Sequence, residues 1–282
     1  MTSPRLPRAK ADLVAAGREG ARRAFFRSRV LRRALVLVLW PRLRRQTFDL
    51  AHLSFYLEEE AIGPVQRDEA LLLHALTRVV RPRVIVEVGF LGGMSSLNFL
   101  LAMDPSAKLY AFDISAESER LARTHFRGRS AFSFQRKSQE EIIPADVDFQ
   151  RVDLLFLDAS HELALNIRTF ERIHELMADD GIVVIHDTGT WHRDRVPSAY
   201  RETFRSHPYA DNWIGDEEYQ HQPEEREFVN WIRETHPEYA QLQLHTTRTL
   251  RHGMTLLQRG RPLATNPELS ARLRAQLPAR QG

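Results

Sequence analysis

Two acidic residues that each close an apolar run are the strongest candidates for chemistry in this sequence. Asp158 follows Val152–Leu157, and Asp187 follows Ile182–Ile185 with His186 between them. If these runs are neighbouring parallel strands, about 4.8 Å apart, both carboxylates lie at the same edge of the sheet. Two carboxylates at such a short separation repel each other unless a positive charge lies between them. A divalent cation with oxygen ligands, usually Mg²⁺, meets that need.

Two histidines accompany these acids. An imidazole at His186 suits Mn, Fe, Co or Ni better than Mg²⁺. Three roles for His186 stay open: a metal ligand, a substrate contact or a packed residue. His161 follows Asp158 by three residues, where a helix is expected to begin, and a neutral imidazole there could take the proton of a metal-bound alcohol near pH 7. The simpler interpretations are a helix cap for Asp158 and a surface residue for His161.

A glycine-rich turn precedes these residues in the chain. It reads Glu87-Val-Gly89-Phe-Leu-Gly92-Gly93 and follows the β-branched run Val84–Val88. The spacing differs from the nicotinamide pattern G-x-G-x-x-G, because Leu91 stands two residues after Gly89, and it favours a ligand without a phosphate. Asp113 ends the next predicted strand, where a carboxylate accepts hydrogen bonds from both hydroxyls of a ribose. The alternative is a purely structural turn with Asp113 as a helix cap.

The elements that must position these residues alternate between strand and helix. The sequence predicts five buried strands, at Val84–Val88, Lys108–Asp113, Ala131–Gln135, Val152–Leu157 and Ile182–Ile185. It predicts helices at Arg67–Val80, Ser95–Met103, Ser115 to about Phe126, Glu162–Met177 and Glu224–Thr235. Apolar strands separated by helices favour an α/β fold, a doubly wound Rossmann-like parallel sheet covered on both faces. A hairpin of Leu242–Leu250 and Met254–Gln258 adds an antiparallel pair, and residues 188–223 are predicted to form a cap or loop.

Composition narrows the possible classes. The 282 residues include no cysteine, which excludes disulfide scaffolds, thiolate zinc sites and cysteine nucleophiles and makes a cytoplasmic enzyme the default. Residues 1–45 hold thirteen Lys or Arg against two acids, whereas the remainder holds 27 basic and 35 acidic residues. The body is therefore mildly acidic, and we expect no nucleic-acid partner.

The basic residues gather in a predicted helical N-terminal arm, residues 1–58. Its longest apolar run, Ala34–Trp40, has seven residues, whereas a spanning helix needs about twenty. Two interpretations stay open. The arm packs on the body or on a second subunit, or it lies on a membrane surface as a peripheral contact with its arginines against anionic lipid. We expect one domain at residues 59–262 and a tail at 263–282. Six histidines are assigned to structure: His52, His74, His125, His174, His236 and His252.

Together these motifs resemble the class I S-adenosylmethionine-dependent methyltransferases. The segment 62–97, IGPVQRDEALLLHALTRVVRPRVIVEVGFLGGMSSL, is similar to the opening of small-molecule O-methyltransferases. Residues 152–188 are similar to the metal-dependent branch, which includes macrolide-sugar and cephalosporin-cluster enzymes. The resemblance covers about residues 60–260 and implies a sheet order of 3-2-1-4-5-7-6. It also implies a cofactor site for S-adenosylmethionine lined by Glu87, Gly89, Gly93 and Asp113, with Ser138 near the adenine.

The same resemblance implies a metal held by Asp158 and by two residues after the fifth strand, with His161 as the base. Here those two residues are His186 and Asp187 rather than two acids, which is a departure from the family. We therefore predict a divalent-metal-assisted O-methyltransferase, with Mg²⁺ as the first choice, acting on a hydroxyl of a sugar or polyketide-type metabolite. Two alternatives stay open: a metal-independent methyltransferase with a histidine base, and a non-catalytic subunit of a biosynthetic or membrane-associated assembly. A homo-oligomer is compatible with each.

Overall fold

The computed structural model describes residues 65–192, 213–215, 218–220, 222–244, 252–260 and 266–275, together with Ser28, Val30 and Ala34. The predicted N-terminal arm therefore lies outside the described residues except for those three positions. In the predicted tail, Pro267–Ala275 form helix α9. No helix within the described ranges combines the length and the apolar character that crossing a membrane requires.

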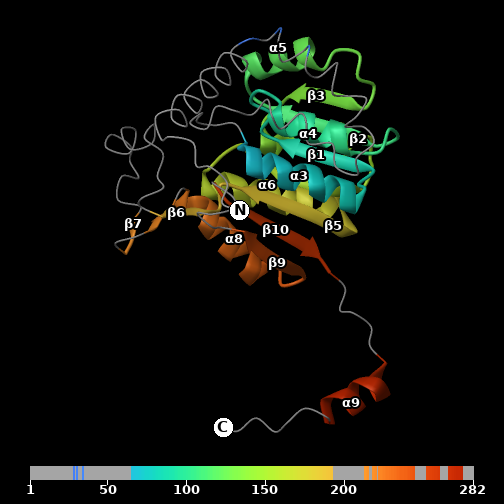
Figure 1. Cartoon of the computed structure of the whole chain (residues 1–282), viewed down its shortest axis with the longest axis vertical. Helices are drawn as coiled ribbons and strands as arrows, with labels where there is room; N and C mark the ends of the chain where they lie inside the picture. Colours follow the sequence, from blue (N-terminus) through green and yellow to red (C-terminus); the bar gives the residue numbers. More distant parts are fainter. Residues whose placement is uncertain are drawn as a thin grey trace, which may run out of the picture.

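One sheet of seven strands organises the domain (Figure 1). Its order is β3-β2-β1-β4-β5-β10-β9, which confirms the predicted 3-2-1-4-5-7-6 arrangement. Strand β10 runs antiparallel to both of its neighbours, and the other pairs are parallel. The strands are β1 (Val84–Val88), β2 (Lys108–Asp113), β3 (Phe132–Arg136), β4 (Val152–Leu157), β5 (Met177–His186), β9 (Tyr239–Leu244) and β10 (Met254–Arg259).

Helices cover both faces of this sheet, as the apolar strands predicted. On one face, α3 (Arg67–Val80) and α4 (Met94–Ala102) bury Leu73 and Phe99 against alternate strand residues such as Leu154. Helix α5 (Ala116–His125) packs on the same side, near β2 and β3. On the other face, α6 (Leu163–Ile173) and α8 (Pro223–Thr235) bury Phe170 and Phe228 in a second cluster. The alternation of inward and outward residues along each strand explains why two separate cores form.

Three element boundaries differ from the sequence predictions. The helix expected to run to Met177 ends at Ile173, a 3-10 turn follows, and β5 already begins at Met177. Asp180 and Gly181 lie inside β5, where the register with β4 shifts in a bulge. A bulge accommodates a polar pair that reads as a turn in sequence. The first hairpin strand is Tyr239–Leu244 rather than Leu242–Leu250, and the last six residues of that predicted strand lie outside the described chain.

The region predicted as a cap, residues 188–223, contains regular structure where it is described. Three short strands, β6 (Thr190–His192), β7 (Trp213–Ile214) and β8 (Glu218–Gln220), pair antiparallel in the order β6-β8-β7. Trp191 and Tyr219 are buried there with their rings stacked, the ring centres 6.1 Å apart. This sheet follows directly from the end of β5, so it lies beside the edge that carries the predicted site.

Candidate functional site

The carboxyl ends of the central strands form one connected edge. Gly89 N–H donates to the Phe112 carbonyl at 2.9 Å, and Asp158 N–H donates to the Val88 carbonyl at 2.8 Å. These bonds join the residues that follow β1, β2 and β4. All the site residues predicted from the sequence therefore lie on elements that meet at this edge.

Asp113 fixes the glycine-rich turn. Its Oδ2 accepts N–H bonds from Phe90 at 3.1 Å and Leu91 at 2.9 Å, and its Oδ1 accepts the Ser115 N–H at 2.8 Å. A carboxylate has about four acceptor positions, so the turn takes three of them. Binding both hydroxyls of a ribose would require Asp113 to share or exchange its bonds to the turn.

The two glycines predicted for the cofactor site are also required by the packing of the chain itself. Gly89 has φ +98°, and a Cβ there would lie 2.0 Å from the Asp158 carbonyl oxygen. Gly93 has φ +79°, and a Cβ there would lie 2.6 Å from the Phe90 ring. Gly92 differs, because a Cβ would meet no atom within 4 Å. Close contacts with other residues of the same chain thus account for Gly89 and Gly93, whereas Gly92 faces open space.

Glu87 is completely buried beneath the first turn of α4. The hydroxyls of Ser95 and Ser96 donate to its two carboxyl oxygens. Burial raises the pKa of Glu87 to about 8, against the lowering effect of these two hydroxyls. Glu87 is therefore protonated near neutral pH in the chain alone, and a positively charged ligand group beside it would favour its ionised form.

Ser138 lies at the start of a short 3-10 turn after β3. Its N–H donates to Glu141 at 3.3 Å, and the N–H of the preceding Lys137 donates to the Asp113 carbonyl at 2.9 Å. This bond holds the segment with Ser138 next to the end of β2. The assignment of Ser138 to an adenine contact stays a prediction.

A pocket lies between the glycine-rich turn and the acidic residues. It encloses about 220 Å³ of space that is partly open to solvent. Its lining includes Gly89, Leu91, Gly92, Ser95 and Asp158. The pocket therefore adjoins the predicted cofactor turn on one side and the first predicted metal ligand on the other.

The structure brings Asp158, His186 and Asp187 together, as the strand ends predicted. His186 Nδ1 lies 2.9 Å from Asp158 Oδ1 and 3.3 Å from Asp187 Oδ1. Asp187 has φ +60°, a left-handed conformation that Asp tolerates better than most residues and that recurs at functional sites. The carboxylates of Asp158, Asp187 and Glu69 hold the pKa of His186 well above its ordinary value, against the effect of burial. In the chain alone, this ring supplies the positive charge between the acids.

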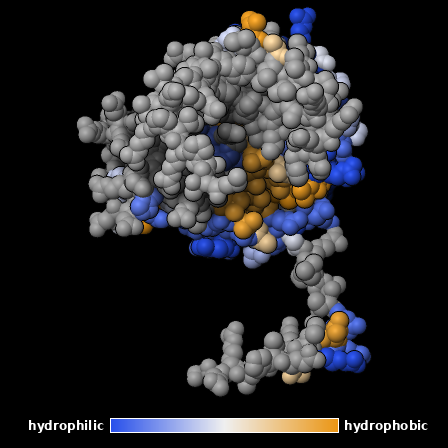
Figure 2. Space-filling model, viewed as in Figure 1, coloured by the Kyte–Doolittle hydropathy of each residue, from blue (hydrophilic) through white to orange (hydrophobic). Residues whose placement is uncertain are grey.

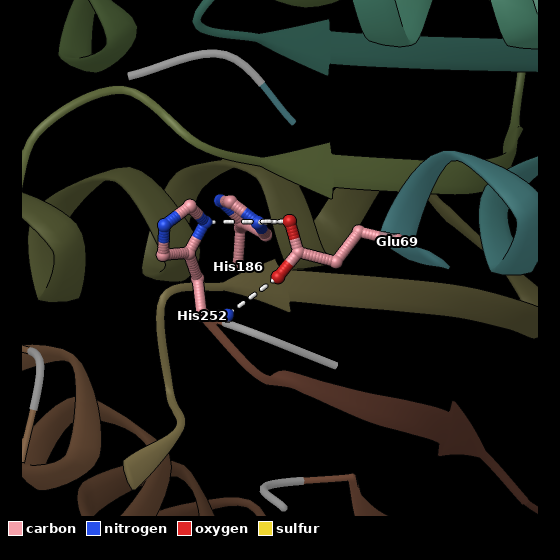
Figure 3. Close-up of side chains that lie close together, drawn as sticks. All are labelled: Glu69, His186 and His252. Atoms are coloured by element: carbon pink, nitrogen blue, oxygen red, sulfur yellow. Dashed lines mark hydrogen bonds and ion pairs between the residues drawn. The ribbon is translucent and has the colours of Figure 1, made fainter. Parts of the chain in front are cut away.

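Glu69 and His252 complete this cluster and were not assigned a function from the sequence (Figure 3). Glu69 Oε2 lies 3.1 Å from His186 Nε2 and 3.3 Å from His252 Nδ1. All three side chains are buried, and they come from α3, the end of β5 and the residues just before β10. His252 was assigned to structure, and the structure instead places its ring beside the predicted metal ligands.

His161 pairs with a second unpredicted glutamate. Its Nδ1 lies 3.2 Å from Glu225 Oε1, and its Nε2 lies 3.5 Å from Asp187 Oδ2. Asn166 also donates to Glu225 Oε1, at 2.9 Å. Burial lowers the pKa of His161, but the Glu225 hydrogen bond and the Asp187 charge outweigh it and raise the pKa to about 9. The side chain of His161 is 37% exposed, so one ring nitrogen is held by a buried acid while the ring remains accessible.

The donor set fits a divalent cation. The ligand atoms of Asp158, His186 and Asp187 lie within 4.8 Å of one another. In an octahedral site with bonds of about 2.1 Å, neighbouring ligand atoms are about 3.0 Å apart, close to the 2.9 and 3.3 Å separations given above. Two carboxylate oxygens and one imidazole nitrogen suit Mn²⁺, Fe²⁺ or Co²⁺ at least as well as Mg²⁺.

Comparisons with known proteins agree with this geometry. Residues 86–188 match the family model described as a methyltransferase domain. That match begins in β1 and ends just after Asp187, so it spans the glycine-rich turn, Asp113 and the acidic pair. The match covers residues 86–188, and over this part the chain is similar to methyltransferases. This similarity supports the suspected family, and the sheet order confirms the predicted fold.

Solved structures of methyltransferases share the fold of this chain at low identity. A Staphylococcus aureus protein provisionally assigned as a caffeoyl-CoA O-methyltransferase has a TM-score of 0.55 at 16% identity and covers 82% of this chain and 100% of its own. A Bacillus cereus O-methyltransferase bound to S-adenosylhomocysteine has a TM-score of 0.52 at 16% identity, covering 80% and 97%. The O-methyltransferase TomG from Streptomyces achromogenes, bound to S-adenosylmethionine, has a TM-score of 0.51 at 18% identity, covering 77% and 92%. No curated protein sequence matches the chain.

Proposed function

We propose that this methyltransferase transfers the methyl group of S-adenosylmethionine to a hydroxyl oxygen of a small molecule, with a divalent cation held by Asp158, His186 and Asp187. The observation that carries the proposal is the convergence of these three side chains beside the pocket at the glycine-rich turn. A sugar or polyketide-type metabolite is the acceptor class that the sequence resemblance favours. The structural neighbour TomG, an O-methyltransferase involved in tomaymycin synthesis, supports a small-molecule acceptor.

We assign His161 as the base. When Nδ1–H donates to Glu225, the lone pair of Nε2 is free to accept a proton on the side of the site that holds Asp187. His161 takes the proton of the acceptor hydroxyl, and the oxygen then uses its electron pair to bond the methyl carbon. The bond from that carbon to the sulfonium sulfur breaks, and sulfur keeps the electron pair, so that S-adenosylhomocysteine leaves. A bound divalent cation would lower the pKa of the acceptor hydroxyl.

The charge balance of the site favours the metal-assisted form over the metal-independent alternative. With a pKa of about 9, His161 is protonated at neutral pH in the chain alone and could not accept a proton. Asp187 is one of the charges responsible for that shift. A cation on Asp158 and Asp187 would offset their negative charge, which lowers the pKa of His161 towards the neutral range where a base works.

Methyl transfer to an acceptor panel of sugars and phenols tests this proposal. We expect turnover in the presence of Mg²⁺ or Mn²⁺, loss with EDTA and recovery when the metal is restored. Asp158→Asn and Asp187→Asn should abolish turnover but still bind S-adenosylhomocysteine. Full turnover in EDTA would favour a metal-independent histidine base. Stable binding of a partner protein without turnover on any acceptor would favour the non-catalytic alternative.

A further inference from the structure

A completely buried carboxylate, Glu69, lies beside His186 (Figure 3), next to Nε2 of the ring, whereas Nδ1 faces Asp158 and Asp187. It is the third residue of α3, at the end where the helix dipole favours negative charge. Two backbone N–H groups hold it in place: Gln66 N–H donates to Oε2 at 2.8 Å, and His252 N–H donates to Oε1 at 2.6 Å. Both oxygens therefore have fixed positions before any contact with a histidine ring is considered.

The contact with His186 determines which ring nitrogen carries the proton. Oε2 of Glu69 lies 3.1 Å from Nε2, and an ionised carboxylate can only accept a hydrogen bond. Nε2 makes no aligned hydrogen bond in the described chain, but at this separation a hydrogen on Nε2 makes the contact with the carboxylate favourable, whereas a lone pair would make it repulsive. In a neutral imidazole the other nitrogen then has a lone pair, and Nδ1 faces Asp158 and Asp187. A lone pair aimed at two carboxylates is unfavourable, so Nδ1 also carries hydrogen in the chain alone, and it would become a ligand only when a cation lies between the carboxylates.

We propose that Glu69 is the positioning residue of the metal site: it holds His186 in the form protonated at Nε2, so that Nδ1 is directed as a ligand towards the cation shared with Asp158 and Asp187. This inference rests on the proposed function, because it assumes that a metal binds there. Metal-binding histidines commonly donate their second N–H to a carboxylate, which fixes the ring and strengthens its donor nitrogen. The contacts of Glu69 with His252 tie the same carboxylate to the start of β10.

Glu69 itself is poorly placed to bind the metal directly. Its two oxygens are occupied by the backbone N–H groups of Gln66 and His252, and its nearest ring contact is with Nε2, the nitrogen of His186 that faces away from the two aspartates. Glu69, His186 and His252 also have ligand atoms within 4.8 Å of one another, but Oε2 already accepts the Gln66 N–H and contacts both rings, which leaves little acceptor capacity for a metal. The carboxylate is better suited to hold the ring than to bind the ion.

Mn²⁺ binding to the full chain tests this inference. In Glu69→Gln, the amide can turn its NH₂ group towards Nε2, so His186 moves its proton to Nδ1, and Mn²⁺ affinity should fall about 10- to 100-fold. We expect a nitrogen hyperfine coupling on Mn²⁺ bound to the wild type. This coupling should be lost in both Glu69→Gln and His186→Gln. Glu171→Gln, an exposed glutamate on α6, is the matched control and should leave both unchanged.

The outcomes separate this inference from the proposed function. If the wild type binds no Mn²⁺, both the metal site and the role of Glu69 are overturned. If the wild type binds Mn²⁺ and Glu69→Gln binds it equally, with the same nitrogen coupling, only the role of Glu69 is overturned. Should Glu69→Gln fail to fold, histidine nitrogen NMR of the wild type with Zn²⁺ decides: we expect His186 protonated at Nε2, and a proton on Nδ1 would overturn the inference.

Discussion

At the scale of single residues, His161 is the side chain whose surroundings most resemble those of a base. It combines a buried acid on Nδ1 with an accessible ring next to Asp187. We predict that His161→Gln lowers kcat by about 100- to 10,000-fold, the usual contribution of a general base, without changing the affinity for S-adenosylhomocysteine. His125→Gln, an exposed histidine at the end of α5, is the control. An equal loss in both variants would remove the assignment.

The same histidine should make the stability of the metal-free chain depend on pH. The folded-state pKa of about 9 lies above the ordinary value of 6.5, so the charged ring favours the folded chain. That contribution is complete below about pH 6.5 and disappears as the pH rises towards 9. In EDTA, the difference in Tm between wild type and His161→Gln should therefore be largest at pH 6 and close to zero at pH 9.5. A difference that does not change with pH would contradict the assigned pKa.

At the scale of elements, two substitutions in the glycine-rich turn should have different effects, one on folding and the other on cofactor binding. Gly89→Ala brings a Cβ within 2.0 Å of the Asp158 carbonyl at φ +98°, and we predict a loss of about 3 kcal/mol in the free energy of unfolding. Gly92→Ala meets no atom within 4 Å and should change stability by about 0.5 kcal/mol or less. Because Gly92 lines the pocket, its replacement should instead weaken cofactor binding. Denaturant titration and calorimetry measure the two effects, and a stable Gly89→Ala would show that the turn can move away from β4.

The elements also show what the sequence could and could not predict. Asp158, His186 and Asp187 were predicted because the ends of neighbouring parallel strands must meet. Glu69 and Glu225 were missed because each lies on a helix far from those strands in sequence. A signal was nonetheless present. Each glutamate is in the first turn of its helix and in line with an apolar stripe: Glu69 with Leu73 and Leu76, and Glu225 with Phe228, Val229 and Ile232. An acid in line with an apolar stripe is expected to face the core, and a buried carboxylate needs a hydrogen-bonding or charged partner there.

At the scale of the whole molecule, the site draws on five segments of the chain: α3, the end of β4, the end of β5, α8 and the residues just before β10. A metal that joins the ends of β4 and β5 should therefore stabilise the entire domain. At a Mn²⁺ concentration 100 times Kd, mass action predicts about 2.7 kcal/mol of additional stability, visible as a rise in Tm. Asp158→Asn should remove that rise. An unchanged Tm in the wild type would argue against a metal at this edge.

The exposed apolar residues of the described chain form a surface feature of their own. Figure 2, in the same view as Figure 1, shows an apolar patch with hydrophilic residues below it. Leu71 and Val79 on α3 and Leu242 on β9 are exposed apolar residues of the described chain. This surface contrasts with the carboxyl edge of the sheet, whose buried polar residues include Glu69, His186, Asp187 and His252.

Binding of S-adenosylhomocysteine, measured by calorimetric titration of the wild type and of Asp113→Ala, tests the central claim most directly. We predict micromolar affinity in the wild type and its loss in Asp113→Ala, because Asp113 anchors the turn and is the residue that we expect to accept the ribose hydroxyls. Glu117→Ala, an exposed acid at the start of α5, is the control and should bind as the wild type does. Absence of binding in the wild type, with and without Mg²⁺, would contradict the assigned cofactor site and with it the proposed methyl transfer.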